Sequence, residues 1–98
     1  MFSVKVHETG GEKLVACCDK ELVGTILSDG ELDLHVSERF YAEDEVDGEQ
    51  LTSILSDASI ANLIGDNVVG FAVEEGLVDE ANVVNVCGVK HAQVFMLG

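Results

Sequence analysis

The sequence predicts an α+β domain, a two-layer sandwich in which helices cover one face of a mostly antiparallel sheet. Short segments of alternating apolar and polar residues lie near both ends of the chain, and two longer apolar segments lie between them. Because the order is strands, two helices, strands, the helices are expected on one face of the sheet. Ninety-eight residues predict a single domain, 1–98.

Two strands joined by a tight turn are predicted at the N-terminus. Residues 2–7, "FSVKVH", alternate as in a half-buried strand, whereas 13–18, "KLVACC", are apolar on both parities, as in a strand covered on both faces. Gly10-Gly11 suits the hairpin between them. Asp19 is then expected to cap the short segment "KELVG", which Gly24 would end.

Two further hairpins are predicted from alternation and turn residues. The first runs through "TIL", the turn "SDGE" and "LDLHV", and the second through "NVVNVC", the turn "GVK" and "HAQVFML". His7 and His35 fall on the polar parity of their strands, so both are expected to face solvent.

Two consecutive helices are predicted at 49–63 and 67–75. Six acids in 38–50 precede the first helix, whose N-terminus favours negative charge. Apolar residues then recur at helical spacing: Leu51, Ile54, Leu55, Ala58 and Ala61.

The junction of the helices is expected to be a structural corner, with Gly65 ending the first helix and Asp66 capping the second. Gly65 and Gly70 do not form a phosphate-binding loop, because such a loop continues with Lys and Ser or Thr, whereas Phe71 and Ala72 follow here. Gly70 lies inside the second helix, where glycine is expected to mark close packing.

The charge of the chain limits its partners. Five Lys and Arg face nineteen Asp and Glu, a net charge of −14. Nucleic-acid affinity comes mostly from cations that replace counterions at phosphates, so direct nucleic-acid binding is not expected, nor is binding to anionic membranes. A basic protein surface is a better partner, and an acidic surface adapted to a salty cytoplasm is the simpler interpretation. The oligomeric state stays open.

Three cysteines, Cys17, Cys18 and Cys87, have no disulfide spacing, and the chain has no signal peptide pattern; both observations favour the cytoplasm. Cys87 and His91 form C-x3-H, and Cys18 could join them from a neighbouring strand. A closed zinc site has four ligands at paired spacings, so buried cysteines and a surface histidine are the simpler interpretation, and no cofactor is expected.

Two other groups of residues are candidates for binding. Arg39, Phe40 and Tyr41 precede an acidic run and could anchor an interface, because Arg and Tyr are enriched at binding hot spots. Alternatively, Phe40 holds the loop on the core while Arg39 pairs with an acid. Asn62 lies among apolar residues, so its amide needs a partner, either the backbone of the Gly65 corner or a ligand.

Four segments, "VACCDKELVGT", "FYAEDE", "ASIANLIGDNVVGFAVEEGLV" and "CGVKHAQV", together resemble the archaeal family called domain of unknown function 424 over about residues 2–96. The resemblance implies a small α+β cytoplasmic protein without an established activity. It points to nine positions without assigning them roles: Cys18, Asp19, Gly24, Phe40, Tyr41, Asn62, Gly65, Asp66 and His91. The helix–glycine–helix order is also similar to an RNA-binding KH module, but "IGDNVVG" lacks the spacing and positive charge of its GxxG loop.

The leading prediction is a non-catalytic binding module that docks on a protein or ribonucleoprotein partner through Arg39, Phe40, Tyr41 and the acidic segment after them. Two alternatives stay open. One is an enzyme or metal site built from Cys18, Asp19, Cys87 and His91, and the other is an RNA-binding module on a KH-like frame.

Overall fold

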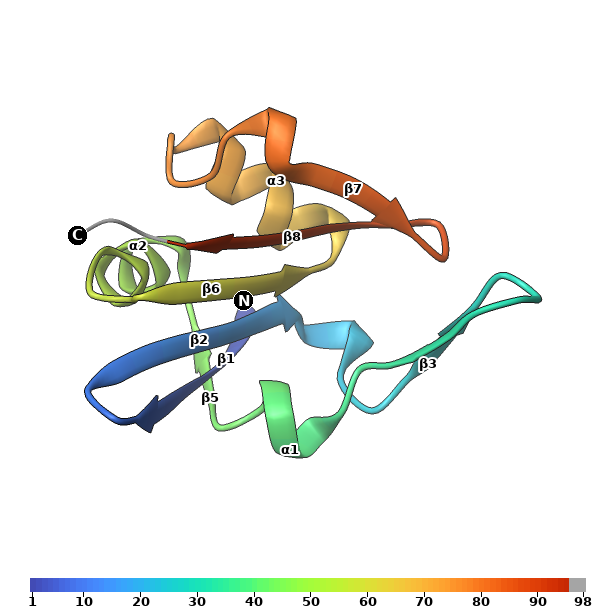
Figure 1. The fold of residues 1–98 in the computed structure, drawn as a ribbon, viewed down its shortest axis with the longest axis horizontal. Coiled ribbons are helices and arrows are strands. Elements are labelled where there is room, and N and C mark those ends of the chain that lie inside the picture. The colour runs from blue at the N-terminus through green and yellow to red at the C-terminus, as the bar shows by residue number, and fades with distance from the viewer. Residues whose placement is uncertain (96–98) are drawn as a thin grey trace.

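The computed structural model describes residues 1–95. Its centre is a six-stranded sheet in the order β5-β1-β2-β6-β8-β7 (Figure 1). Neighbouring strands are antiparallel except for β2 and β6, which are parallel. The predicted α+β class is therefore confirmed. The strands of this sheet are β1 (Phe2–Thr9), β2 (Glu12–Asp19), β5 (Asp44–Val46), β6 (Ile60–Ile64), β7 (Val83–Val86) and β8 (Val89–Phe95).

One face of the sheet is covered by α2 (Gly48–Ser56) and α3 (Asp66–Glu74). The main core lies between these helices and the sheet, where Leu51 and Leu55 of α2 and Val68 of α3 pack with Val15 and Cys17 of β2. Asp47 and Gln50 form a capping box that fixes the start of α2. Among the described residues, no helix is long and apolar enough to cross a membrane.

The opposite face is partly covered by α1 (Glu38–Tyr41) and by a hairpin arm of β3 (Ile26–Ser28) and β4 (Asp33–His35). The arm is a separate two-stranded sheet that projects from the body (Figure 1). A second cluster of buried residues lies beneath this cover and includes Ala16, Cys18, Val36, Tyr41 and Ile64. Strand β2 is thus buried on both faces, as "KLVACC" predicts.

The predicted helix 49–63 is wrong beyond residue 56. Residues 60–64 form β6, which lies between β2 and β8 in the middle of the sheet. The apolar residues from Leu51 to Ala61 come from α2, from the connection after it (Ala58) and from β6. All of them pack in the same core, and together they imitate one helical stripe. The two helices are therefore not consecutive, although both cover one face.

Two short elements of the acidic segment, α1 and β5, were not expected from the sequence. The predicted closing hairpin is present as β7 and β8, with its turn at Cys87-Gly88. Residues 96 and 97 of the predicted last strand lie outside the described residues. Two 3₁₀ turns complete the chain, η1 (Lys20–Leu22) and η2 (Glu80–Asn82).

Candidate functional site

Three side chains of β1 hold α1 against the sheet. Ser3 Oγ donates to the Tyr41 carbonyl at 3.0 Å, Lys5 Nζ donates to the Arg39 carbonyl at 2.9 Å, and His7 Nε2 lies 2.9 Å from the Phe40 carbonyl. Alternate residues of a strand point to one face, and carbonyls at the end of a helix have no partner within it. The polar side chains of β1 therefore bind α1, and the expectation that His7 faces solvent is wrong.

The side chains of α1 take three different positions. Arg39 is exposed and Phe40 is half-buried, with its ring stacked on that of His7 at a centroid distance of 4.8 Å. Tyr41 is only 7% exposed, and its hydroxyl donates to Asn62 Oδ1 at 2.9 Å. Burial raises the pKa of Tyr41 to about 12, so its hydroxyl stays a donor at neutral pH.

Asn62 therefore finds its partner in Tyr41, and the prediction that it bonds the backbone of the Gly65 corner is wrong. Its position on β6 explains the difference. The side chain of Asn62 points to the face of the sheet on which α1 lies, opposite to that of Leu63 in the main core.

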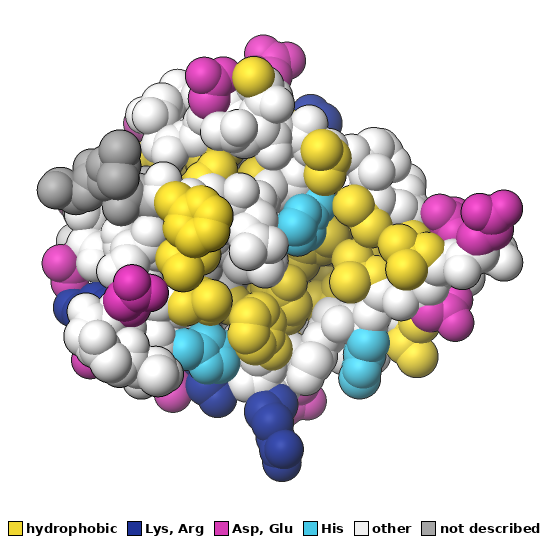
Figure 2. Space-filling model, in the orientation of Figure 1, with side chains coloured by type: hydrophobic (Ala, Val, Ile, Leu, Met, Phe, Trp, Pro, Cys, Tyr) yellow, Lys and Arg dark blue, Asp and Glu magenta, His cyan; other side chains and the backbone are white. Residues whose placement is uncertain are grey.

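Beside α1, part of the sheet carries no helix. We call this area the open face and define it by six residues of β6, β7 and β8 that share one side of the sheet: Ile60, Asn62, Val84, His91, Gln93 and Phe95. Phe95 is 75% exposed and Val84 54% exposed. Figure 2 shows a hydrophobic patch across this side of the molecule, with histidine side chains beside it. Burial lowers the pKa of His91, which favours its neutral form at pH 7.

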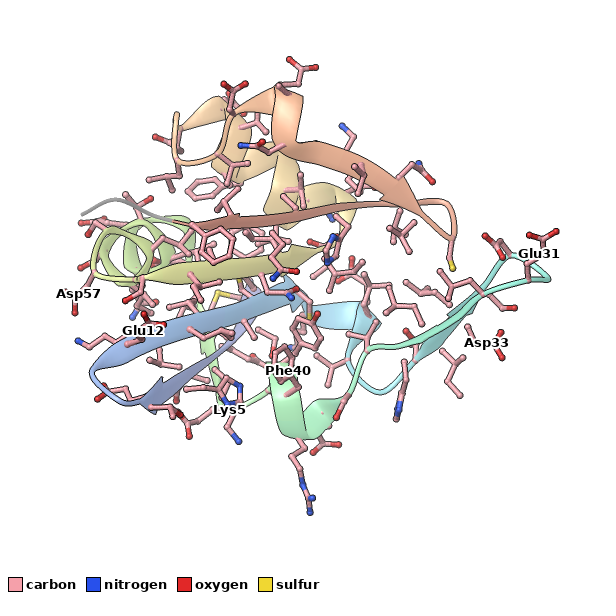
Figure 3. All side chains as sticks on the ribbon, viewed as in Figure 1. Lys5, Glu12, Glu31, Asp33, Phe40 and Asp57 are labelled. Atoms are coloured by element: carbon pink, nitrogen blue, oxygen red, sulfur yellow. The ribbon has the colours of Figure 1, made fainter. Side chains whose placement is uncertain are left out.

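Acidic residues lie at both ends of this side of the molecule. Glu12 and Asp57 lie at one end and Glu31 and Asp33 on the arm at the other, with Phe40 between them (Figure 3). Next to α1, four carboxylates line a pocket of about 340 Å³ that also contains Lys20: Glu38, Glu43, Asp44 and Glu45.

The cations are not gathered into one patch. Lys13 is paired with Asp57, Lys20 is paired with Glu45 at 3.3 Å, and Lys5 binds the Arg39 carbonyl. Lys90 lines a separate pocket with α3 and β7.

The corner between β6 and α3 is closed by Asp19. Its carboxylate accepts from the backbone N–H of Asn67 at 3.0 Å and of Val68 at 2.7 Å, although Asp19 comes from the end of β2. Gly65 has φ +127°, and a Cβ there would lie 2.5 Å from Asp19 Cγ. Asp66 instead accepts from the Lys90 N–H at 2.9 Å.

Three predictions at this corner are therefore wrong. Gly65 follows a strand and does not end a helix, Asp66 does not cap α3, and the Asp19 carboxylate does not cap η1. Asp19 instead joins β2 to α3, Gly65 makes room for Asp19 at the end of β6, and Asp66 joins α3 to β8. These contacts agree with a structural corner.

Cys18, Cys87 and His91 do not form a cluster. Cys18 is fully buried, and His91 lies two strands away in the sheet, a distance of about 10 Å. Cys87 is in the β7–β8 turn, where its Sγ lies 3.5 Å from the Leu32 carbonyl on the arm. Within residues 1–95, no three His, Cys, Asp or Glu side chains are placed to hold a metal ion.

The buried thiols also lack the ionisation that nucleophilic chemistry requires. Burial raises the pKa of Cys18 to about 12 and raises that of Cys17 further. Neither thiol forms appreciable thiolate at neutral pH.

The open face could not be found from the sequence, although one signal was present. In "HAQVF", His91, Gln93 and Phe95 alternate with Ala92 and Val94, which predicts that they share one side of a strand. Which side of that strand a helix covers depends on the strand order, and the order cannot be assigned when residues 60–64, the central strand β6, are predicted as helix.

The fold and surface define a small α+β protein with a mostly antiparallel sheet, helices on one side and a partly uncovered opposite side. The chain belongs to the family described as "Protein of unknown function (DUF424)", whose model matches residues 7–97. The family predicted from the sequence is thus confirmed.

A solved structure supports the same fold. The chain is similar to the crystal structure of an uncharacterized conserved protein from Methanopyrus kandleri, with 25% sequence identity and a TM-score of 0.82. The similarity covers 98% of this chain and 91% of that chain. Among curated proteins, none matches the chain significantly.

Proposed function

We propose that this protein is a non-catalytic binding module that docks on a protein or ribonucleoprotein partner through the open face, Arg39 and Phe40. The observation that carries the proposal is the uncovered sheet beside α1, where Phe95 is 75% exposed. An apolar patch with a polar rim is typical of interaction surfaces, because water contact with the patch is unfavourable until a partner covers it.

The arrangement of α1 suits this role. Tyr41 and the three β1 side chains fix α1 to the sheet, so Arg39 and Phe40 are presented on a rigid support. Preorganised groups lose little conformational entropy on binding, and here the Phe40 ring is held by stacking on His7. Tyr41 itself is buried and supports the surface without contacting the partner.

The acids at the ends of this side and in the pocket beside α1 favour a partner with a basic rim. Complementary charge accelerates association and excludes acidic competitors. The same acids repel a bare phosphate backbone, so a protein component is expected to make the contact, even where the partner is a ribonucleoprotein.

The test is capture of partners from a native lysate with three immobilised proteins: wild type, the double variant Arg39→Ala/Phe95→Ser, and the control Ile26→Ser. Ile26 is 65% exposed on the arm, so its variant removes exposed apolar area outside the open face. We expect specific proteins on wild type and on the control, at least about tenfold depleted on the double variant.

A nuclease-treated lysate tests which component makes the contact, because a contact through RNA is lost and a contact through protein is kept. Circular dichroism confirms that each variant is folded. Equal recovery by all three proteins would show that the open face binds nothing.

A further inference from the structure

A separate cavity lies on the helix-covered side of the sheet, between α3 and the edge strand β7. Its volume is about 250 Å³. The walls are apolar side chains of α3 and β7, Gly70 exposes the helix backbone to it, and three charged residues complete the lining. The residues are Val69, Gly70, Val73, Glu74, Glu80, Val83 and Lys90.

Gly70 has no structural explanation within the described chain. It lies inside α3, where glycine is about 1 kcal/mol less favourable than alanine. It is not among the glycines with positive φ, and a Cβ there would meet no atom within 4 Å. The expectation that Gly70 marks close packing is therefore wrong. What the missing methyl group provides is room in the cavity.

The cavity is lined by charged residues of both signs, which can contact a ligand. Lys90 contributes an ammonium group, and Glu74 and Glu80 contribute carboxylates. Within residues 1–95, the lysines that form ion pairs are Lys13 and Lys20, so Lys90 is not neutralised by either glutamate. An apolar cavity lined by one cation and two anions is complementary to a small zwitterion with an apolar side chain.

We propose that this cavity binds a free α-amino acid with an aliphatic side chain. The side chain lies against Gly70, Val73 and Val83, the carboxylate faces Lys90, and the ammonium faces the two glutamates. The volume is below the roughly 300–1,000 Å³ of pockets for drug-sized ligands, which suits a small metabolite. The site is independent of the open face, because Lys90 and Phe95 differ in strand parity and point to opposite sides of the sheet.

The test is a titration of the ¹⁵N-labelled protein with L-leucine and L-valine, followed by amide chemical shifts. We expect saturable shifts confined to residues around the cavity: 69–74, 80–83 and 90. Isoamylamine and 4-methylpentanoate each lack one charge of leucine, and each is expected to bind at least about tenfold more weakly. Lys90→Gln is expected to weaken leucine binding without changing the affinity for the amine.

Gly70 variants separate the cavity from helix stability. Gly70→Ala is expected to raise the melting temperature while weakening leucine at least about tenfold, and Gly70→Val to abolish binding. Asn67→Ala, at an exposed position of α3, is the control that improves helix propensity and leaves binding unchanged.

The proposal is overturned if neither amino acid gives saturable shifts, if Gly70→Val binds like wild type, or if Gly70→Ala destabilises the protein. It is equally overturned if the amine or the acid alone binds as tightly as leucine. None of these results depends on capture of a partner by the open face.

Discussion

At the scale of single residues, Asp19 illustrates how a side chain distant in sequence can cap a helix. It is 5% exposed, and both of its carboxylate oxygens accept backbone N–H groups of α3. Asp19→Ala would leave those donors unsatisfied and remove a negative charge from the positive end of the helix. We expect the free energy of unfolding to fall by about 2–4 kcal/mol, measured by urea denaturation.

Asp66→Ala is the matched control, because Asp66 is exposed and accepts a single backbone N–H, from Lys90. Its loss should cost about 1 kcal/mol or less. If the two variants cost the same, the cap by Asp19 does not stabilise α3 as the geometry indicates.

Gly65 allows close contact between β6 and Asp19. An added Cβ would lie 2.5 Å from Asp19 Cγ at a φ of +127°, whereas at Gly30 it would meet no atom within 4 Å, also at positive φ. Gly30→Ala is therefore the comparison variant, because it also places alanine at a positive φ, here +95°, but without this contact. We expect Gly65→Ala to lower the unfolding free energy by about 2 kcal/mol more than Gly30→Ala. Equal losses in denaturant melts would mean that Asp19 moves aside without cost.

The three thiols are expected to differ in reactivity. Cys17 and Cys18 are fully buried, whereas Cys87 is half-buried in a turn. With Ellman's reagent at pH 7.5, one thiol per native chain should react, and all three only in denaturant. Desolvation and the nearby carboxylates of Asp29 and Asp33 raise the pKa of Cys87, so it should react more slowly than free cysteine. Rapid native modification of two or more thiols would contradict the burial.

At the scale of elements, α1 depends on the bond between Tyr41 and Asn62. The usual pKa of tyrosine is 10.0, and the folded value is about 12 because of burial. Between these pH values the unfolded chain loses the Tyr41 proton more readily than the folded chain does. The contribution of Tyr41 to the free energy of unfolding is therefore present below pH 10 and falls as the pH rises towards 12. Tyr41→Phe removes this contribution and, at pH 7, should cost about 1 kcal/mol for the lost hydrogen bond.

Urea denaturation at pH 7, 10 and 11 tests the effect. Burial also raises the pKa of Cys17 and Cys18, so the stability of the folded state depends on these thiols at high pH as well. Both proteins contain them, so the difference in unfolding free energy between wild type and Tyr41→Phe reports Tyr41. The difference in unfolding free energy between wild type and Tyr41→Phe should decrease from pH 10 to pH 11. A constant gap would show that the hydroxyl ionises as it does in water.

The strands around α1 show what the sequence can and cannot predict. β1 and β2 follow from local alternation and continuous apolar runs, because each pattern matches the burial of its own strand. β6 was mistaken for helix because Ala61 and Leu63 share a core with α2. Asn62 was then assigned the wrong partner, since the bond to Tyr41 joins residues 21 positions apart.

The candidate surface was predicted only in part. Arg39 and Phe40 stand out locally as cationic and aromatic residues ahead of an acidic run, and the structure places both at the surface. Phe95 joins them only through the order of the strands, which local patterns do not specify. Helix α1 itself has only four residues, too few for periodicity to predict.

At the scale of the whole molecule, salt has two opposite effects on stability: it relieves the repulsion that comes from the net charge of −14, and it weakens the exposed ion pairs. Mutual repulsion destabilises the compact state, and salt relieves it, because the screening length falls from about 10 Å at 0.1 M to about 3 Å at 1 M. The exposed ion pairs Lys13–Asp57 and Lys20–Glu45 weaken under the same conditions, but solvent screens such pairs and they contribute little to stability. The melting temperature is therefore expected to rise with KCl.

Salt also distinguishes the two interpretations of this acidity. If the acids serve a basic partner, capture by the open face should decline as KCl rises from 0.1 M to 1 M, while thermal stability increases. If they only adapt the surface to salt, capture should persist, because burial of Phe95 and Val84 does not depend on screening. The triple variant Glu12→Gln/Glu31→Gln/Asp33→Asn changes the net charge from −14 to −11 by removing three carboxylates. It should gain less stability from salt under either interpretation, and it should lose capture at 0.1 M KCl only if the acids serve a basic partner. A melting temperature that falls with KCl would show that local ion pairs outweigh the repulsion, and would contradict the interpretation that the acidic surface is adapted to salt.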